Sequence, residues 1–145
     1  MRIELCIPPL VAVALLCGAS SAWADAHQDY VLNCMGCHMV DGGGAPPTIP
    51  RLKDRVGYYL TIPNGRAYLA QVPGAANSLL DDRQLTDVLN WMVDEFAGAS
   101  RPPTFAPYAI EEVSRYRRKP PADIDALRHE LSDAIVAAYP TAGRW

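Results

Sequence analysis

The hydrophobic and polar positions of this chain alternate with helical spacing in two long segments. From Leu85 to Phe96 the apolar residues fall three or four positions apart, which predicts an amphipathic helix. Ser78-x-x-Asp81 resembles a capping box that opens this helix, and Asp81 and Asp82 place negative charge in its first turn. A second stripe of the same spacing predicts a helix between residues 123 and 139; its apolar members are Ile124, Leu127, Leu131 and Ile135.

Shorter helices are predicted over residues 52–60, 66–72 and 111–119, with a turn at Pro63-Asn64-Gly65. The 145 residues include 13 prolines and 10 glycines, which favour short helices joined by ordered loops. We therefore expect an all-α fold of a size that suits one domain, followed by a helical C-terminal extension.

The N-terminal segment predicts export. An apolar run over residues 10–16 is followed by Ala22-Trp23-Ala24, which supplies small residues where a signal peptidase needs them. We predict that residues 1–24 are a signal peptide cleaved after Ala24, with Ala26 as the second choice, and that the product is periplasmic. The run is too short to span a bilayer and no other stretch is long enough, so the mature chain is expected to have no transmembrane segment.

Composition narrows the classes of partner. Half of the residues are hydrophobic, 20% are charged and the formal net charge is -3, which is the balance of a globular protein. A general nucleic-acid binder needs a basic surface, so this charge argues against nucleic acid as a partner.

Candidate chemistry is concentrated at Cys34-Met35-Gly36-Cys37-His38, a C-x-x-C-H motif. This is the pattern of covalent c-type haem attachment. Residues three apart in a helical turn share a face, so both thiols can reach the two vinyl groups on one edge of a haem, and the adjacent histidine can bind its iron. Cys34 and Cys37 are therefore the candidate attachment residues for one haem c per chain, and His38 is the candidate proximal ligand.

Three other uses of the two cysteines have less support. A thioredoxin-like redox pair needs a βαβ pattern, which does not surround residues 34–37, and a zinc site needs a second ligand pair, whereas His27 and His129 are isolated. A structural disulfide between Cys34 and Cys37 remains compatible with export. No nucleophile–base set and no second metal motif is visible, so we expect the protein not to be an enzyme in its own right.

Around this motif, over residues 27–97, the chain resembles the class I c-type cytochromes. In that family the haem motif follows a short helix, a Gly-rich loop comes next, and a C-terminal helix packs across the first. Here residues 29–32 match the short helix and residues 41–44 match the loop. Pro50-Arg51-Leu52 matches the family's Pro-x-Leu segment, which implies that the Pro50 carbonyl accepts a hydrogen bond from His38; Pro47 is the competing assignment.

The resemblance also implies a small all-α pocket around the haem, with Val56 as a further haem-facing candidate; the residues expected to line it are Leu52, Tyr59, Tyr68, Leu89 and Met92. Most members of the family supply a methionine to the far side of the iron from a loop before the last helix. The corresponding residues 71–78 contain neither Met nor His. Met35 and Met39 are tethered beside the proximal histidine, which leaves Met92 as the candidate distal ligand. The remaining alternatives are His27, His129 and an open distal site.

The resemblance implies a periplasmic cytochrome that carries single electrons from a dehydrogenase to an oxidase or another cytochrome. The missing loop methionine leaves a second possibility, a haem-based sensor or small-ligand binder with an open distal site. The C-terminal extension leaves a third, a haem subunit of a dehydrogenase complex.

Residues 99–145 lie outside the resemblance, so we divide the mature chain into a haem domain over 25–98 and this extension. It opens with a proline-containing linker and an aromatic strap over residues 104–108. Its apolar stripe either packs on the chain's own core or anchors the protein to a dehydrogenase subunit. A basic cluster is either a solvated helix end or a docking surface for an acidic redox partner; it consists of Arg115, Arg117, Arg118 and Lys119.

Overall fold

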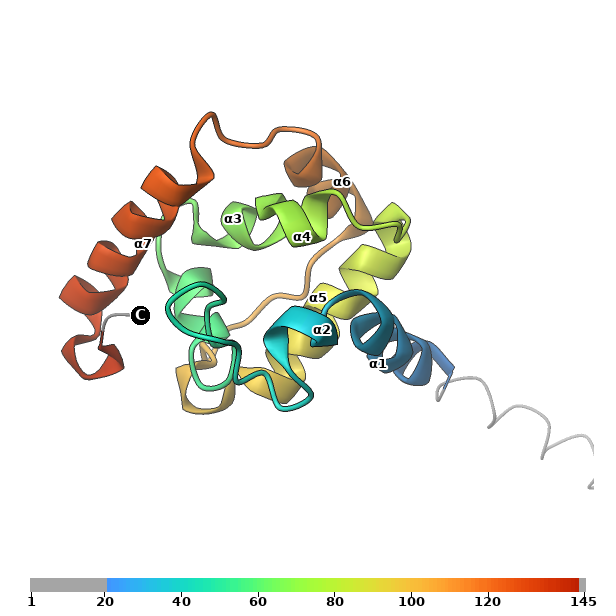
Figure 1. The fold of residues 1–145 in the computed structure, drawn as a ribbon, viewed down its shortest axis with the longest axis horizontal. Coiled ribbons are helices and arrows are strands. Elements are labelled where there is room, and N and C mark those ends of the chain that lie inside the picture. Colours follow the sequence, from blue (N-terminus) through green and yellow to red (C-terminus); the bar gives the residue numbers. More distant parts are fainter. Residues whose placement is uncertain (1–20, 144–145) are drawn as a thin grey trace, which may run out of the picture.

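The computed structural model describes residues 21–143 as helices joined by loops (Figure 1). In chain order the elements are α1 (Ser21–Asn33), α2 (Met35–His38), the 3-10 helix η2 (Val56–Thr61), α3 (Gly65–Gln71), α4 (Pro73–Ala76), α5 (Asp82–Phe96), η3 (Gly98–Ser100), α6 (Ile110–Arg117), α7 (Ile124–Ala138) and η4 (Pro140–Ala142). No β-strand forms within residues 21–143. An isolated β-bridge joins Ala45 and Ile49. The expectation of an all-α fold is confirmed.

The predicted signal peptide falls almost entirely on residues 1–20, which lie outside the described residues. Cleavage after Ala24 therefore stays a prediction. None of the helices in residues 21–143 is both long enough and apolar enough to cross a membrane.

Helices α1 and α5 pack against each other through aromatic rings. The Tyr30 ring of α1 lies 5.0 Å from the Trp91 ring and 5.2 Å from the Phe96 ring, centroid to centroid, and the two α5 rings are 5.4 Å apart. Rings at these separations add attraction beyond the burial of their area. This contact fixes the end of α1 that leads into Cys34.

Helix α5 begins with a capping box, although not the one predicted. Asp81 is the N-cap: its carboxylate accepts from the Gln84 backbone N–H at 2.8 Å, and its own N–H donates to Gln84 Oε1 at 3.1 Å. The prediction that Ser78 opens this box is wrong, because the Ser78 hydroxyl donates to the Ala75 carbonyl at 2.9 Å instead. Asp82 does lie in the first turn, where its charge complements the helix dipole.

The helix predicted over residues 52–60 forms only in its second half, as the 3-10 helix η2. Asp54 has φ 58, a left-handed conformation that no helix continues through. The Asp54 N–H donates to the Phe96 carbonyl at 2.7 Å, so this kink ties the loop to the end of α5. A second difference is α4, which forms a short turn of helix inside residues 71–78, a segment treated as loop in the prediction.

The extension packs on the same hydrophobic core as the rest of the chain. Helix α6 lies against α3 and α5, and α7 lies against η2. Leu131 and Ile135 of the predicted stripe are buried in this core, and Ile124 and Leu127 are partly buried against it. Of the two uses proposed for the stripe, packing on the chain's own core is therefore the one that the structure shows. The linker is anchored as well, because the Gly57 N–H donates to the buried Ser100 hydroxyl at 3.0 Å.

Candidate haem site

The two cysteines lie on the first turn after α1. Backbone N–H groups of Cys37 and His38 donate to the Cys34 carbonyl at 3.1 and 3.0 Å, which forms the helical turn that the motif needs. Residues three apart in such a turn project from the same side of the backbone. Both cysteines are free thiols; Cys34 is half-buried and Cys37 is exposed. Two thiols at this spacing, one of them at the surface, match the two vinyl groups on one haem edge.

The His38 ring is held by a backbone carbonyl. Its Nδ1 lies 3.2 Å from the Pro50 oxygen. A carbonyl can only accept, so Nδ1 carries the proton and the Nε2 lone pair is left for a metal. The resemblance implied this contact for Pro50, with Pro47 as the competitor, and the structure gives it to Pro50.

A glycine allows the Pro50 carbonyl to approach. Gly44 has φ 65, and its N–H donates to the His38 carbonyl at 3.0 Å. A Cβ at this position would lie 2.6 Å from the Pro50 oxygen, which is closer than any side chain tolerates. Gly44 therefore belongs to the cradle that places the Pro50 carbonyl under His38.

The ionisation of His38 suits a role as an iron ligand. Burial lowers the pKa of His38, and the Pro50 hydrogen bond partly offsets this, so the ring is neutral at pH 7 and able to ligate iron. Burial, with the charges of Asp29 and Cys37, raises the pKa of the Cys34 thiol to about 11. Within residues 21–143, no three His, Cys, Asp or Glu side chains gather to hold a metal ion.

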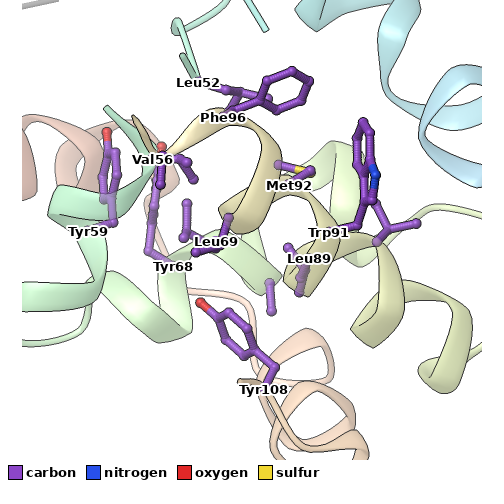
Figure 2. Close-up of a cluster of buried hydrophobic side chains, with 14 of the residues drawn as sticks. Leu52, Val56, Tyr59, Tyr68, Leu69, Leu89, Trp91, Met92, Phe96 and Tyr108 are labelled. Atoms are coloured by element: carbon purple, nitrogen blue, oxygen red, sulfur yellow. The ribbon is translucent and has the colours of Figure 1, made fainter. Parts of the chain in front are cut away.

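Apolar side chains are buried beyond the motif (Figure 2). They come from the loop after His38, from η2, α3 and α5, and include all five predicted pocket residues: Leu52, Tyr59, Tyr68, Leu89 and Met92. The Tyr59 and Tyr68 rings stack at 5.3 Å with their planes 15° apart. Arg128 of α7 reaches this wall, and its Nε donates to the Tyr68 hydroxyl at 3.0 Å. Two thiols, a neutral imidazole with a free Nε2 and an apolar wall are a donor set that fits a covalently bound haem.

Met92, the predicted distal ligand, lies within α5 and is 8% exposed. Figure 2 shows it between Phe96 and Trp91 on that helix. Of the alternative ligands, the His27 ring lies 5.2 Å from the Trp91 ring at the α1–α5 contact, and His129 is exposed on α7.

The segment that carries a distal methionine in most class I cytochromes is held by an arginine instead. The Arg117 guanidinium donates to the carbonyls of Ala76 at 3.2 Å, Ser78 at 3.2 Å and Leu80 at 2.9 Å. It also binds the Asp82 carboxylate at 3.2 Å, and its side chain is 12% exposed. Arg117 therefore holds residues 76–80 in place, and residues 71–80 contain neither methionine nor histidine.

The predicted basic cluster is thus partly internal. Arg117 is committed to the contacts above, and Arg118 donates to the other Asp82 oxygen at 2.8 Å. The Arg115 guanidinium lies 5.2 Å from the centroid of the Tyr116 ring. The prediction did not single out Arg117 as structural, and it did not name Arg128 at all. The hydrogen-bond partners of Arg117 and Arg128 lie far away in the sequence, so no local sequence pattern predicts these contacts.

Comparison with known proteins gives two similar chains. A cytochrome c-552 from one strain of Thermus thermophilus is 31% identical over an alignment 142 residues long, and the alignment covers 84% of this chain and 95% of that protein. A second cytochrome c-552 from Thermus thermophilus is 30% identical over an alignment 128 residues long, and this alignment covers 74% of this chain and 97% of that protein. No protein-family model matches the chain. A match over 84% of the chain is longer than residues 27–97, so the expectation that the likeness is confined to that range is wrong.

Proposed function

Because the chain belongs to the monohaem c-type cytochromes, we propose that it carries single electrons in the periplasm from a dehydrogenase to an oxidase or another cytochrome. Membership of this family makes the chain an electron-transfer protein that carries covalently bound haem c. The chain has one C-x-x-C-H motif and therefore one haem. The compartment, the donor and the acceptor are our proposal. The observation that carries it is the set of Cys34, Cys37 and His38 on one turn, with His38 held by Pro50.

In this proposal each residue of the motif has its own task. Cys34 and Cys37 are the residues that would hold the haem, through two thioether bonds. His38 would bind the iron through Nε2, and the Pro50 carbonyl orients the ring and raises its basicity. When bound, the haem supplies one-electron exchange between ferric and ferrous iron.

The buried apolar side chains around the site are expected to raise the reduction potential of the haem. Leu52, Tyr59 and Leu89 are buried and exclude water from the site. The ferric state carries one more positive charge than the ferrous state, so a dry surrounding disfavours it and raises the reduction potential. Cys37 is exposed, which leaves the thioether edge at the surface, where a redox partner can approach. Small, short-lived contacts are typical of such encounters.

Localisation in the periplasm is supported by the predicted signal peptide over residues 1–24, since thioether formation follows export. The proposed layout is a haem domain over residues 25–98 and an extension over 99–145, both packed on one core.

The proposal is tested by producing the chain with its leader in a host that matures c-type cytochromes. The product is expected to lack residues 1–24 by mass, and to keep haem on a denaturing gel because the bond is covalent. Cys34→Ala and Cys37→Ala each remove one attachment bond, and the double variant loses covalent haem. Cys17→Ala is the matched control, because this cysteine lies in the predicted leader. An exported, folded wild type without covalent haem refutes the proposal.

A second candidate function is a haem-based binder or sensor of small ligands. The observation that favours it is the segment 71–78, which contains neither Met nor His and whose end Arg117 holds at the carbonyls of Ala76 and Ser78. In the electron-carrier proposal Met92 would be the second residue, after His38, to hold the iron. The oxidised wild type then shows the weak far-red band of sulfur ligation, Met92→Leu loses it, and Met39→Leu keeps it. Carbon monoxide that binds the reduced wild type rapidly at neutral pH establishes the open site instead.

A further inference from the structure

One tyrosine of α1 is hydrogen-bonded to both ends of the segment that contains the C-x-x-C-H motif. The Tyr30 carbonyl accepts from the Cys34 N–H at 2.8 Å, and the Tyr30 hydroxyl donates to the Met39 carbonyl at 2.6 Å. Cys34 is the first residue of the motif, and Met39 directly follows His38, which is the last. The backbone from Cys34 to Met39 is therefore fastened at both ends to the same residue.

The position of the Tyr30 hydroxyl is set by the packing of α1 on α5. Tyr30 is 1% exposed, and its ring contacts the rings of Trp91 and Phe96. A ring enclosed in this way keeps one orientation, because core side chains are close-packed. Burial also raises the pKa of Tyr30 to about 12, so the hydroxyl keeps its proton and stays a donor around neutral pH. The core thus presents a fixed donor to the end of the motif.

The acceptor of this hydrogen bond lies on a turn that needs support. Met39 has φ 64, a left-handed conformation that is unfavourable for a residue with a side chain. Its own side chain is 44% exposed and packs little against the protein. The Gly42 N–H reaches the Met39 carbonyl only at 3.4 Å, so the hydrogen bond from Tyr30 is the shorter of the two. The Tyr30 hydroxyl therefore stabilises the strained conformation of Met39.

The turn at Met39 continues directly from His38, whose ring has an anchor of its own. The Pro50 oxygen lies 3.2 Å from Nδ1 of that ring. The backbone of His38 sets where the side chain starts, and Pro50 sets how the ring is rotated, so the direction of Nε2 depends on both. A shift of the Met39 carbonyl would move the His38 backbone and lengthen the bond to Pro50. Groups that orient a ligating histidine also tune the metal that it binds.

We propose that Tyr30 is a positioning residue for the proximal ligand, an inference that rests on the proposed function. Its hydroxyl holds the Met39 carbonyl and thereby keeps the His38 ring at the Pro50 oxygen. The aromatic contact between α1 and α5 is in this way coupled to the basicity of His38. A phenylalanine would fill the same space but would break this coupling, so the hydroxyl, and not the ring, performs the task.

The test uses the haem-loaded protein and the variant Tyr30→Phe, which keeps the ring and removes the hydroxyl. Tyr108→Phe is the matched control, because Tyr108 is also buried and its hydroxyl donates to a backbone carbonyl, that of Arg66. Two quantities are measured: the hyperfine-shifted proton resonances of His38 in the NMR spectrum of the oxidised protein, which report the orientation of the ring, and the midpoint reduction potential.

Tyr30→Phe is expected to move the His38 resonances and to raise the potential. The reason is that a weaker hydrogen bond to Pro50 makes His38 a poorer electron donor to ferric iron. Tyr108→Phe is expected to leave both quantities at their wild-type values.

A purely structural tyrosine gives a different result. If the Tyr30 hydroxyl only stabilises the fold, both phenylalanine variants lower the melting temperature, and neither changes the His38 resonances or the potential. That outcome overturns the inference, while the covalent haem keeps the proposed function intact. Should Tyr30→Phe fail to accumulate, the wild type decides. A Tyr30 hydroxyl proton that exchanges as fast as that of free tyrosine overturns the inference, and a protected proton with a nuclear Overhauser contact to Met39 upholds it. A wild type without covalent haem overturns both proposals at once.

Discussion

The guanidinium of Arg66 lies 3.9 Å from the centroid of the Tyr108 ring, and the Tyr108 hydroxyl donates back to the Arg66 carbonyl at 2.9 Å. The same guanidinium binds both oxygens of the Glu112 carboxylate, at 2.6 and 2.8 Å. The side-chain amide of Asn90 completes the arrangement. Its oxygen accepts a hydrogen bond from the Tyr108 N–H, and its nitrogen donates one to the Tyr108 carbonyl. One arginine of α3 thereby joins the aromatic strap to α6.

Replacing Glu112 by Gln is expected to lower stability at neutral pH and to make it less sensitive to acid. The hydrogen bond from Arg66 holds the pKa of Glu112 below its usual value. The pair therefore stabilises the fold above the pKa of the unfolded carboxyl, and this contribution is lost as the pH falls through the folded pKa. We expect a deficit of about 1 kcal/mol at pH 7 that disappears in acid. Urea unfolding over a pH series measures it, with Asp87→Asn at an exposed pair as the control. A deficit that is equal at every pH contradicts the prediction.

Replacing Arg117 by Met is expected to cost about 2–3 kcal/mol of unfolding free energy, because three backbone carbonyls lose their donor. Arg118→Met removes the same charge from a side chain that is 71% exposed, and should cost under about 0.5 kcal/mol. Denaturant titration of both variants gives the difference. Equal costs for the two would show that Arg117 acts only through its charge.

Gly44→Ala is expected to destabilise the protein by about 1–3 kcal/mol, because the added Cβ meets the Pro50 oxygen and because alanine disfavours φ 65. Gly74→Ala is the control, since a Cβ there meets nothing within 4 Å and the residue lies in α4. Thermal unfolding of the two variants separates them. A Gly44→Ala protein as stable as wild type would mean that the Pro50 carbonyl is free to move.

Ile135→Ala tests whether the extension belongs to the core. Ile135 is fully buried in the cluster that also contains Tyr30 and Leu85, so its truncation should cost about 2–5 kcal/mol. Ile110→Ala, at an exposed position of the same extension, should cost far less. Chemical unfolding followed by both haem absorbance and tryptophan fluorescence measures the loss. An Ile135→Ala protein that unfolds like wild type would mean that α7 contributes little to the fold.

Local signals were enough to predict the two long helices, α5 and α7, and the motif. The periodic apolar residues of α5 and α7 and the spacing of Cys34, Cys37 and His38 lie within short windows, where geometry follows directly from the residues. The start of α5 was predicted at the wrong residue because Ser78 and Asp81 both suit a cap. Gln84, three positions after Asp81, decides between them by completing the box.

What could not be predicted depends on distant parts of the chain. The left-handed Asp54 is held by the Phe96 carbonyl, and this interaction shortens the predicted helix at 52–60. Arg117 and Arg128 find their partners 41 and 60 positions earlier, so a basic cluster and a lone arginine look like ordinary solvated charges in the sequence. The sixth ligand of the iron depends on the same long-range packing, which is why Met92 stays a prediction.

The burial of Leu131 and Ile135 in the core also sets an order of events during biosynthesis. The segment with Cys34 and Cys37 is translated long before α7, and the core cannot close until α7 has been made. During that interval both thiols belong to a chain whose fold is incomplete and whose haem site lacks its α7 side. Completion of α7 is therefore the step that closes the core around the segment that carries the two cysteines.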